Sequence, residues 1–134
     1  MNLSPRERRR KSLFPYLSPS GDRYTLYADM LKQPHLLIAG ATGSGKSVVI
    51  NGLVYTALYD SRGGNLFILI DPKRVELAQY KALPHTLQYA SEPDEMRQAI
   101  YNAMQLCENR YREMQRDGAR LYNGGDVYII IDEF

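Results

Sequence analysis

The pattern of apolar and polar positions predicts strands that alternate with helices. Residues 35–40 (HLLIAG), 66–70 (LFILI) and 127–131 (VYIII) are nearly continuous apolar runs, which are typical of strands buried in a parallel sheet. Residues 23–28 (RYTLYA) instead alternate between polar and apolar side chains, so they predict a short, half-exposed strand.

Two shorter segments between these strands predict helices. Residues 47–59 follow a glycine-rich turn and have an apolar side at helical spacing. The expected buried positions are Val48, Leu53, Ala57 and Leu58. Residues 74–83 predict a short helix that ends before Pro84, because proline cannot continue a helix.

A long helix is predicted over residues 91–116. The sequence SEPD has the form of a capping box, with Ser91 as the N-cap, Pro93 in the first turn and Asp94 reaching back. Apolar residues then recur at spacings of three and four. The expected buried stripe is Met96, Ile100, Ala103, Cys107, Tyr111 and Met114.

The order of these elements indicates an α/β domain with a parallel sheet flanked by helices and right-handed crossovers. The 134 residues suit one domain at most. Residues 1–21 hold three prolines and show little periodicity, so we expect a flexible basic lead-in there. The α/β domain would then cover residues 22–134.

The amino-acid composition is that of a soluble globular protein and does not by itself indicate a function. With 44% hydrophobic and 24% charged residues, the chain is ordinary for a soluble fold, and it has neither a transmembrane-length apolar run nor a signal peptide. Cys107 is the one cysteine, which excludes a disulfide framework and favours the cytoplasm. The net charge of +2 comes from the first 30 residues, mainly from the basic run at residues 6–11. That run suits an arm for nucleic acid or anionic lipid, or a solvated linker; we favour the linker because no aromatic residue interleaves it.

Residues 40–47 (GATGSGKS) match the phosphate-binding pattern G-x-x-x-x-G-K-[ST] at every fixed position. Glycines let backbone N–H groups converge on one anion, and the following helix N-terminus adds positive potential. Lys46 would reach the β- and γ-phosphates of ATP, and the Ser47 hydroxyl would bind Mg²⁺. The predicted nucleotide-binding residues are Gly40, Ala41, Thr42, Gly43, Ser44, Gly45, Lys46, Ser47 and Val48.

Two carboxylates, Asp132 and Glu133, follow the last apolar run. Asp132 is placed to hold Mg²⁺ through water, and Glu133 to polarise the water that attacks the γ-phosphate. A plain kinase would not need a base in this position. The pair therefore favours ATP hydrolysis, with Lys46 and Glu133 as the catalytic residues.

A further polar segment, IDPKRVEL, follows the run at residues 66–70. Asp71 stands at the carboxyl end of a predicted parallel strand, where α/β sheets place their ligands, and Lys73 follows it closely. Either residue is a candidate for an accessory role near the nucleotide or a neighbouring subunit. A polar strand-to-helix turn would explain the same residues.

Several segments together resemble the FtsK/SpoIIIE family of DNA translocases. They lie at residues 28–51, 66–77, 80–85, 109–114 and 128–134, in the order that the family shows. The resemblance implies a RecA-like P-loop NTPase of the ASCE type, which forms a homo-hexameric ring around double-stranded DNA and pumps it with ATP and Mg²⁺. Such motors serve chromosome segregation at cell division, sporulation, and phage or conjugative transfer. The resemblance also strengthens the case for a role of Asp71 and Lys73.

In that family a further strand lies between the phosphate-loop strand and the strand that ends in the acidic pair. The resemblance implies that this strand follows Phe134, so we expect the sequence to be the N-terminal part of a longer motor, with a fold incomplete at its C-terminus. A conjugative coupling-protein-type ATPase and a non-catalytic nucleotide-binding remnant remain alternatives. We expect a cytoplasmic location and leave open a membrane association through partners.

Overall fold

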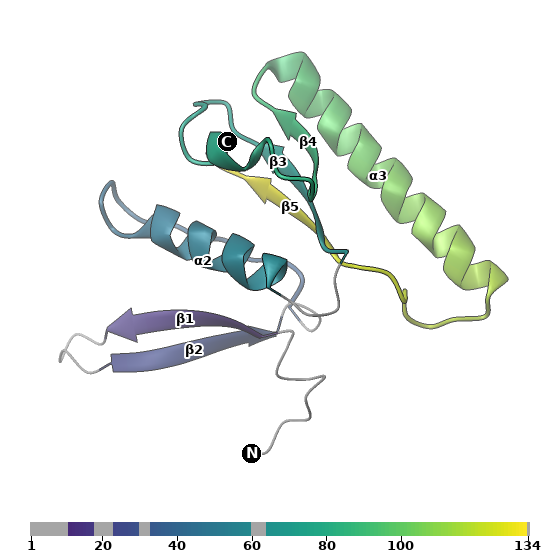
Figure 1. Ribbon diagram of the computed structural model, residues 1–134, viewed down its shortest axis with the longest axis horizontal. Coiled ribbons are helices and arrows are strands. Elements are labelled where there is room, and N and C mark those ends of the chain that lie inside the picture. Colours follow the sequence, from purple (N-terminus) through teal and green to yellow (C-terminus); the bar gives the residue numbers. More distant parts are fainter. Residues whose placement is uncertain (1–10, 18–22, 30–32, 60–63, 134) are drawn as a thin grey trace. The chain divides into compact units, whose positions relative to one another are not determined.

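The computed structural model describes residues 11–17, 23–29, 33–59 and 64–133, and for the first two ranges it describes the backbone alone (Figure 1). The chain divides into two compact units, residues 1–63 and 64–134.

The first unit contains an antiparallel hairpin of strands β1 (Lys11–Leu17) and β2 (Arg23–Asp29). Strand β2 confirms the strand expected at residues 23–28. Strand β1 corrects the expectation of an irregular lead-in at these positions. Its Pro15 lies opposite Thr25, and a two-stranded ribbon tolerates this proline because each strand has an edge that makes no ladder bonds. Residues 1–10, which hold most of the basic run, lie outside the described part.

Helix α2 (Lys46–Leu58) confirms the helix expected after the glycine-rich turn, and within this unit it lies against β1. Its buried side chains are Ile50, Val54 and Ala57, at spacings of four and three. The expected side is right at Ala57 and wrong at Val48, which is 70% exposed. The buried face of α2 is thus rotated about the helix axis from the expected face, so that it includes Ile50 and Val54.

The expected buried strand at residues 35–40 is wrong. Among the residues that the structure describes, no strand forms there, and Leu37 is 79% exposed. A parallel strand needs a neighbour for its backbone N–H and C=O groups. Strand β3 already has neighbours on both sides, and none of the described strands pairs with residues 35–40. Residues 35–40 therefore have a composition typical of a buried strand. The composition alone does not form a strand, because a strand also needs a neighbour with which to form hydrogen bonds.

The second unit has, in its described part, a three-stranded parallel sheet in the order β4-β3-β5. Strands β3 (Leu66–Ile70) and β5 (Val127–Ile131) confirm two of the expected strands, and they pair in register from Leu66↔Val127 to Ile70↔Ile131. Strand β4 (Thr86–Ala90) was missed. This parallel sheet with its packed helix confirms the expected α/β class.

The connection from β3 to β4 is not the expected helix over residues 74–83. It consists of turns and a single 3₁₀ turn, η1 (Ala78–Tyr80). The Asp71 carboxylate accepts a hydrogen bond from the backbone N–H of Leu77, which competes with helical bonding. Leu77 is fully buried, so this tight connection still contributes to the core.

Helix α3 (Pro93–Arg116) packs on the sheet through Met96, Ala99 and Ala103, against a core that includes Ile68 and Ile70. The expected stripe is right at Met96 and Ala103, and Met114 is half-buried. It is wrong at three positions, because the side chains there are exposed: Ile100, Cys107 and Tyr111. The small Ala99, fully buried, lets the helix approach the sheet, so α3 is rotated from the expected face.

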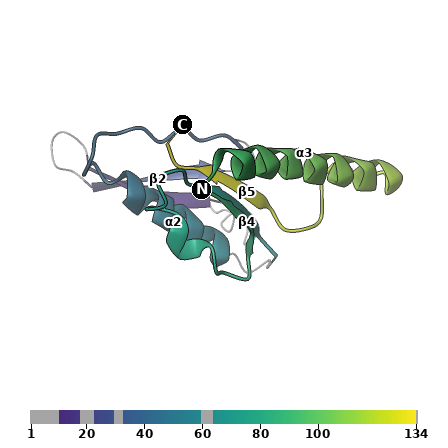
Figure 2. The ribbon, with the colours of Figure 1, turned by 90° about the horizontal axis from the view of Figure 1, so that it is seen from above.

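Helix α3 is also longer than the sheet that it covers. Its 24 residues span about 36 Å, whereas a five-residue strand spans about 17 Å. In both views of the ribbon the second half of α3 extends beyond the strands (Figures 1 and 2). Arg110, in that half, lies with its guanidinium 4.3 Å from the ring centre of Tyr122, which holds the returning chain to the helix. Neither described helix has the length and apolar character that would let it cross a membrane.

The packing face of α3 can be tested with two truncations of equal size. Ile70→Ala removes a 2%-exposed side chain from the core against α3, so we expect the free energy of unfolding to fall by about 2–5 kcal/mol. Ile100→Ala, at a 47%-exposed position, should change it by less than about 1 kcal/mol. Urea unfolding followed by circular dichroism measures both, and a larger loss at Ile100 would contradict the assigned face.

Candidate nucleotide-binding site

The phosphate-binding sequence forms a tight turn that opens directly into α2. Gly43 and Gly45 have φ angles of 80° and 94°, in the left-handed region that side chains other than glycine rarely adopt. Between them, the N–H of Ser44 donates to the carbonyl oxygen of Ala41 at 3.0 Å. The two glycines are thus required by the backbone path that leads into the helix.

The N-terminus of α2 offers its backbone N–H groups to an anion. Its N-cap, Gly45, has no side chain to cap them, and among the described residues the first turn contains no acidic one. Lys46 is the first helical residue, so a cation stands at the positive end of the helix dipole. That arrangement is unfavourable by itself and becomes favourable when an anion binds there.

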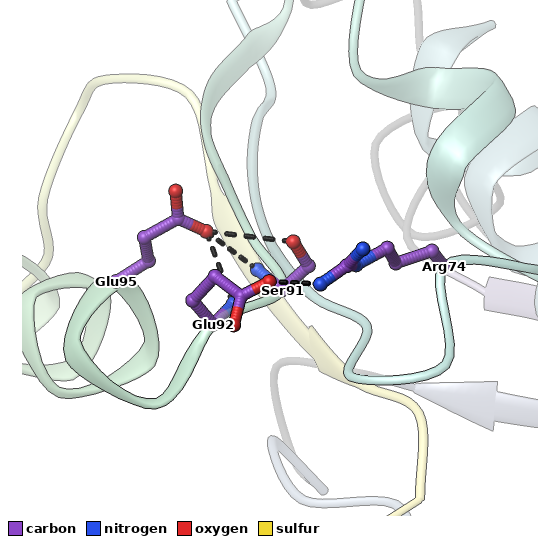
Figure 3. A network of polar contacts seen from close by, with 4 residues as sticks. All are labelled: Arg74, Ser91, Glu92 and Glu95. Atoms are coloured by element: carbon purple, nitrogen blue, oxygen red, sulfur yellow. Dashed lines mark hydrogen bonds and ion pairs between the residues drawn. The ribbon is translucent and has the colours of Figure 1, made fainter.

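The N-terminus of α3 shows the opposite arrangement (Figure 3). Its N-cap is Glu92, one residue after the expected Ser91, and Glu95 rather than Asp94 completes the capping box. The Glu95 carboxylate accepts hydrogen bonds from the backbone N–H groups of Ser91 and Glu92, at 3.0 and 3.1 Å. The longer Glu95 side chain reaches back to both donors, so α3 satisfies its own N-terminus.

The acidic pair lies directly after β5. The N–H of Asp132 donates to the carbonyl oxygen of Ile70 at 2.9 Å, which continues the β3–β5 ladder by one residue. Asp132 is buried, with 4% of its surface exposed, whereas the side chain of Glu133 is 40% exposed. Glu133 has a φ of 53°, an unusual value for a non-glycine residue. One carboxylate is therefore enclosed and the next one reaches solvent.

Asp71 organises the loop that follows β3. Its N–H donates to the carbonyl oxygen of Ala90, and its own carbonyl oxygen accepts from the N–H of Arg74. Its Oδ2 accepts from the N–H of Leu77 at 3.0 Å and from the hydroxyl of Tyr89 at 3.5 Å. Asp71 is fully buried, and these bonds show that its carboxylate holds the loop in place.

The same loop connects the carboxyl ends of all three strands. Lys73 forms an ion pair with Glu133, after β5. Arg74, at a φ of 59°, forms one with Glu92, which follows β4 (Figure 3). Two consecutive cations thus reach carboxylates on opposite sides of β3.

These contacts shift two pKa values. The hydrogen bond to Glu133 and the charge of Glu133 raise the pKa of the Lys73 ammonium, and the charge of Asp132 adds to this. Burial raises the pKa of Tyr89, and the nearby negative charge of Asp71 adds to it. Both groups therefore keep their protons at neutral pH.

Comparison with known proteins identifies the family. A model of the FtsK/SpoIIIE family matches residues 2–132. The chain belongs to the FtsK/SpoIIIE family. It is 43% identical over 107 residues to the DNA translocase FtsK of Rickettsia prowazekii, a match that covers 78% of this chain and 14% of that relative. It is 39% identical over 104 residues to the DNA translocase SpoIIIE of Bacillus subtilis, covering 76% and 13%.

The suspected resemblance to the FtsK/SpoIIIE family is thus confirmed, and with it the P-loop NTPase class. A third relative, the DNA translocase FtsK of Streptococcus pneumoniae, is 40% identical over 103 residues. The matched region spans about one seventh of the length of these curated relatives.

In this family member the predicted site residues fall into two groups. Residues 40–48 belong to the first unit, while Asp71, Lys73, Asp132 and Glu133 belong to the second and lie together at the carboxyl edge of its sheet. Within the described residues no three His, Cys, Asp or Glu side chains gather as a metal-binding group. The predicted Mg²⁺ ligands, Ser47 and Asp132, come from different units, and their pairing stays a prediction.

Sequence reasoning missed two parts of this edge. Strand β4 was overlooked because five residues with one aromatic and one β-branched side chain give a weak pattern. The Arg74–Glu92 ion pair was also missed, since it joins residues whose proximity depends on β4 lying beside β3. The sequence named Lys73 and Glu133 separately and gave no reason to pair them.

The structural role of Asp71 can be tested by removing its carboxylate. Asp71→Ala leaves the buried N–H of Leu77 without its acceptor, so we expect a loss of about 1–3 kcal/mol in the free energy of unfolding. Asp71→Asn keeps an oxygen acceptor and should lose less. Unfolding measurements, with hydrogen exchange at the Leu77 amide, test this; equal exchange in all three proteins would contradict it.

Proposed function

We propose that this chain supplies the nucleotide-binding part of a motor that hydrolyses ATP to move double-stranded DNA. Membership of the FtsK/SpoIIIE family supports this, as do the relatives named DNA translocases. The observation that carries the proposal is the uncapped N-terminus of α2, entered through the left-handed Gly43 and Gly45.

In this proposal the phosphates of ATP bind where α2 begins. Residues 40–48 surround the anion, and their backbone N–H groups supply directional donors. Lys46 adds the positive charge that reaches the β- and γ-phosphates. An anion would relieve the unfavourable position of this cation at the helix N-terminus.

The carboxyl end of β5 supplies the hydrolytic groups. Asp132 offers a buried carboxylate, and Ser47 a hydroxyl; both are the oxygen donors that Mg²⁺ prefers, so these residues suit the ion. When bound, Mg²⁺ would neutralise charge on the β- and γ-phosphates. Glu133, which reaches solvent, would orient and polarise the attacking water.

Family membership supports a proposal for the DNA substrate and the assembly. We propose that the complete protein acts as a homo-hexameric ring around double-stranded DNA, in the cytoplasm, where both ATP and chromosomal DNA are present. The conversion of hydrolysis into movement would require several such nucleotide sites in one ring.

Two substitutions test the catalytic assignment in the native full-length protein. Lys46→Ala removes the phosphate-binding cation and should abolish both ATP binding and DNA-stimulated hydrolysis. Glu133→Gln should lower kcat by about 100-fold or more while ATP binding persists, since the amide keeps the shape but cannot act as a base. Steady-state phosphate release and fluorescent-nucleotide binding measure these two effects.

Lys81→Ala controls for the loss of a lysine, because Lys81 is an exposed lysine of the second unit, which also contains Glu133. Displacement of a triplex-forming oligonucleotide from duplex DNA reports movement. Hydrolysis that survives both active-site substitutions would contradict the site, and hydrolysis without any displacement would contradict translocation.

A further inference from the structure

The ion pair between Lys73 and Glu133 gives Lys73 a specific place in the hydrolytic site. The Lys73 Nζ contacts the Oε2 atom of Glu133, and the two residues follow adjacent parallel strands, β3 and β5. Their side chains are 63% and 40% exposed. A pair this exposed contributes little to the stability of a fold.

The loop that carries Lys73 is held at three points. The carbonyl oxygen of Asp71 accepts from the N–H of Arg74, and the Asp71 carboxylate accepts from the N–H of Leu77. Beyond Lys73, the Arg74 guanidinium pairs with Glu92 at the start of α3 (Figure 3). Lys73 therefore projects from a backbone that is fixed on both sides.

The partner residue is held in an uncommon conformation. Among the described residues, Arg74 and Glu133 are the non-glycine residues with a positive φ, at 59° and 53°. Such a conformation is unfavourable and persists where the surroundings determine it. One of these residues adjoins Lys73 and the other is its partner, so both of these unusual backbone conformations lie at the ion pair.

The charges at this edge also favour a nearby cation. Asp132 and Glu133 are consecutive carboxylates, and the ammonium of Lys73 interacts favourably with both. Without it, repulsion from Asp132 would act on the more exposed Glu133 side chain and turn it toward solvent.

We infer that Lys73 is a positioning residue, whose ammonium fixes the Glu133 carboxylate in the orientation from which it acts on the attacking water. The inference rests on the proposed function, since it requires Glu133 to be the base. Lys73 itself acts only through Glu133. A positioned base contributes because a displacement of about 1 Å at a reacting group can lower the rate by about 100-fold.

The test compares three variants of the native full-length protein with duplex DNA and ATP. Lys73→Met keeps the length of the side chain and removes its charge, so kcat should fall at least about tenfold with KM for ATP unchanged. Lys73→Arg keeps a cation and should recover most of that loss. Lys81→Met makes the same substitution at an exposed lysine in the same unit and should leave kcat unchanged.

A second comparison separates positioning from a general structural effect. In a Glu133→Gln background, Lys73→Met should cause no further loss of kcat, because the group that it positions is already inactive. Equal melting temperatures and equal ATP dissociation constants for all variants would show that folding and nucleotide binding are intact.

Several outcomes would overturn the inference. An unchanged or increased kcat in Lys73→Met would mean that the ion pair does not support the base. A higher KM alone would mean that Lys73 contacts the nucleotide, and a loss that Lys73→Arg does not recover would argue against a role of the charge. If Glu133→Gln abolishes hydrolysis while Lys73→Met has no effect, the proposed function stands without this inference; an unmodified protein that hydrolyses no ATP would contradict the proposed function itself.

Discussion

The parallel hydrogen bonding of β3 to both of its neighbours is the constraint on which the rest of the second unit depends. Because all three strands run the same way, their carboxyl ends meet at one edge of the sheet. The ladders continue beyond the strands, through bonds from Asp71 to Ala90 and from Asp132 to Ile70. Side chains that are 61 residues apart in the sequence are thereby brought to adjacent positions.

The acidic residues at this edge have different tasks, and the difference follows from what surrounds each one. The Asp71 carboxylate accepts a backbone N–H and a tyrosine hydroxyl inside the protein, so it organises the loop. Glu133 reaches solvent and meets a lysine. Asp132 differs from both: it is buried like Asp71 but, like Glu133, it follows β5. Residues placed by a rigid sheet can thus differ in burial and in partners over a short distance.

The N-termini of the two described helices differ in how they are capped. In α3, Glu92 and Glu95 satisfy the first N–H groups and complement the dipole with negative charge. In α2, the N-cap is a glycine, the described first turn has no acidic residue and the first helical residue is a lysine, an arrangement that suits a bound anion. This contrast within one chain supports a phosphate-binding role more specifically than the glycine-rich sequence does by itself.

The sequence by itself determined the features that depend on neighbouring residues: the apolar strands β3 and β5, the helix that follows the glycines, and the phosphate-binding turn. The tertiary structure decided the features that depend on a distant partner. Residues 35–40 have the composition of a strand but no described partner, and α3 buries Ala99 rather than Ile100. Ala99 and Ile100 lie on neighbouring faces of the helix, and the helical spacing of apolar residues fits both faces equally well. The sheet packs closely against α3, so the face with the smaller side chain is buried. The pairing of Lys73 with Glu133 likewise required the sheet, because only strand order places their backbones side by side.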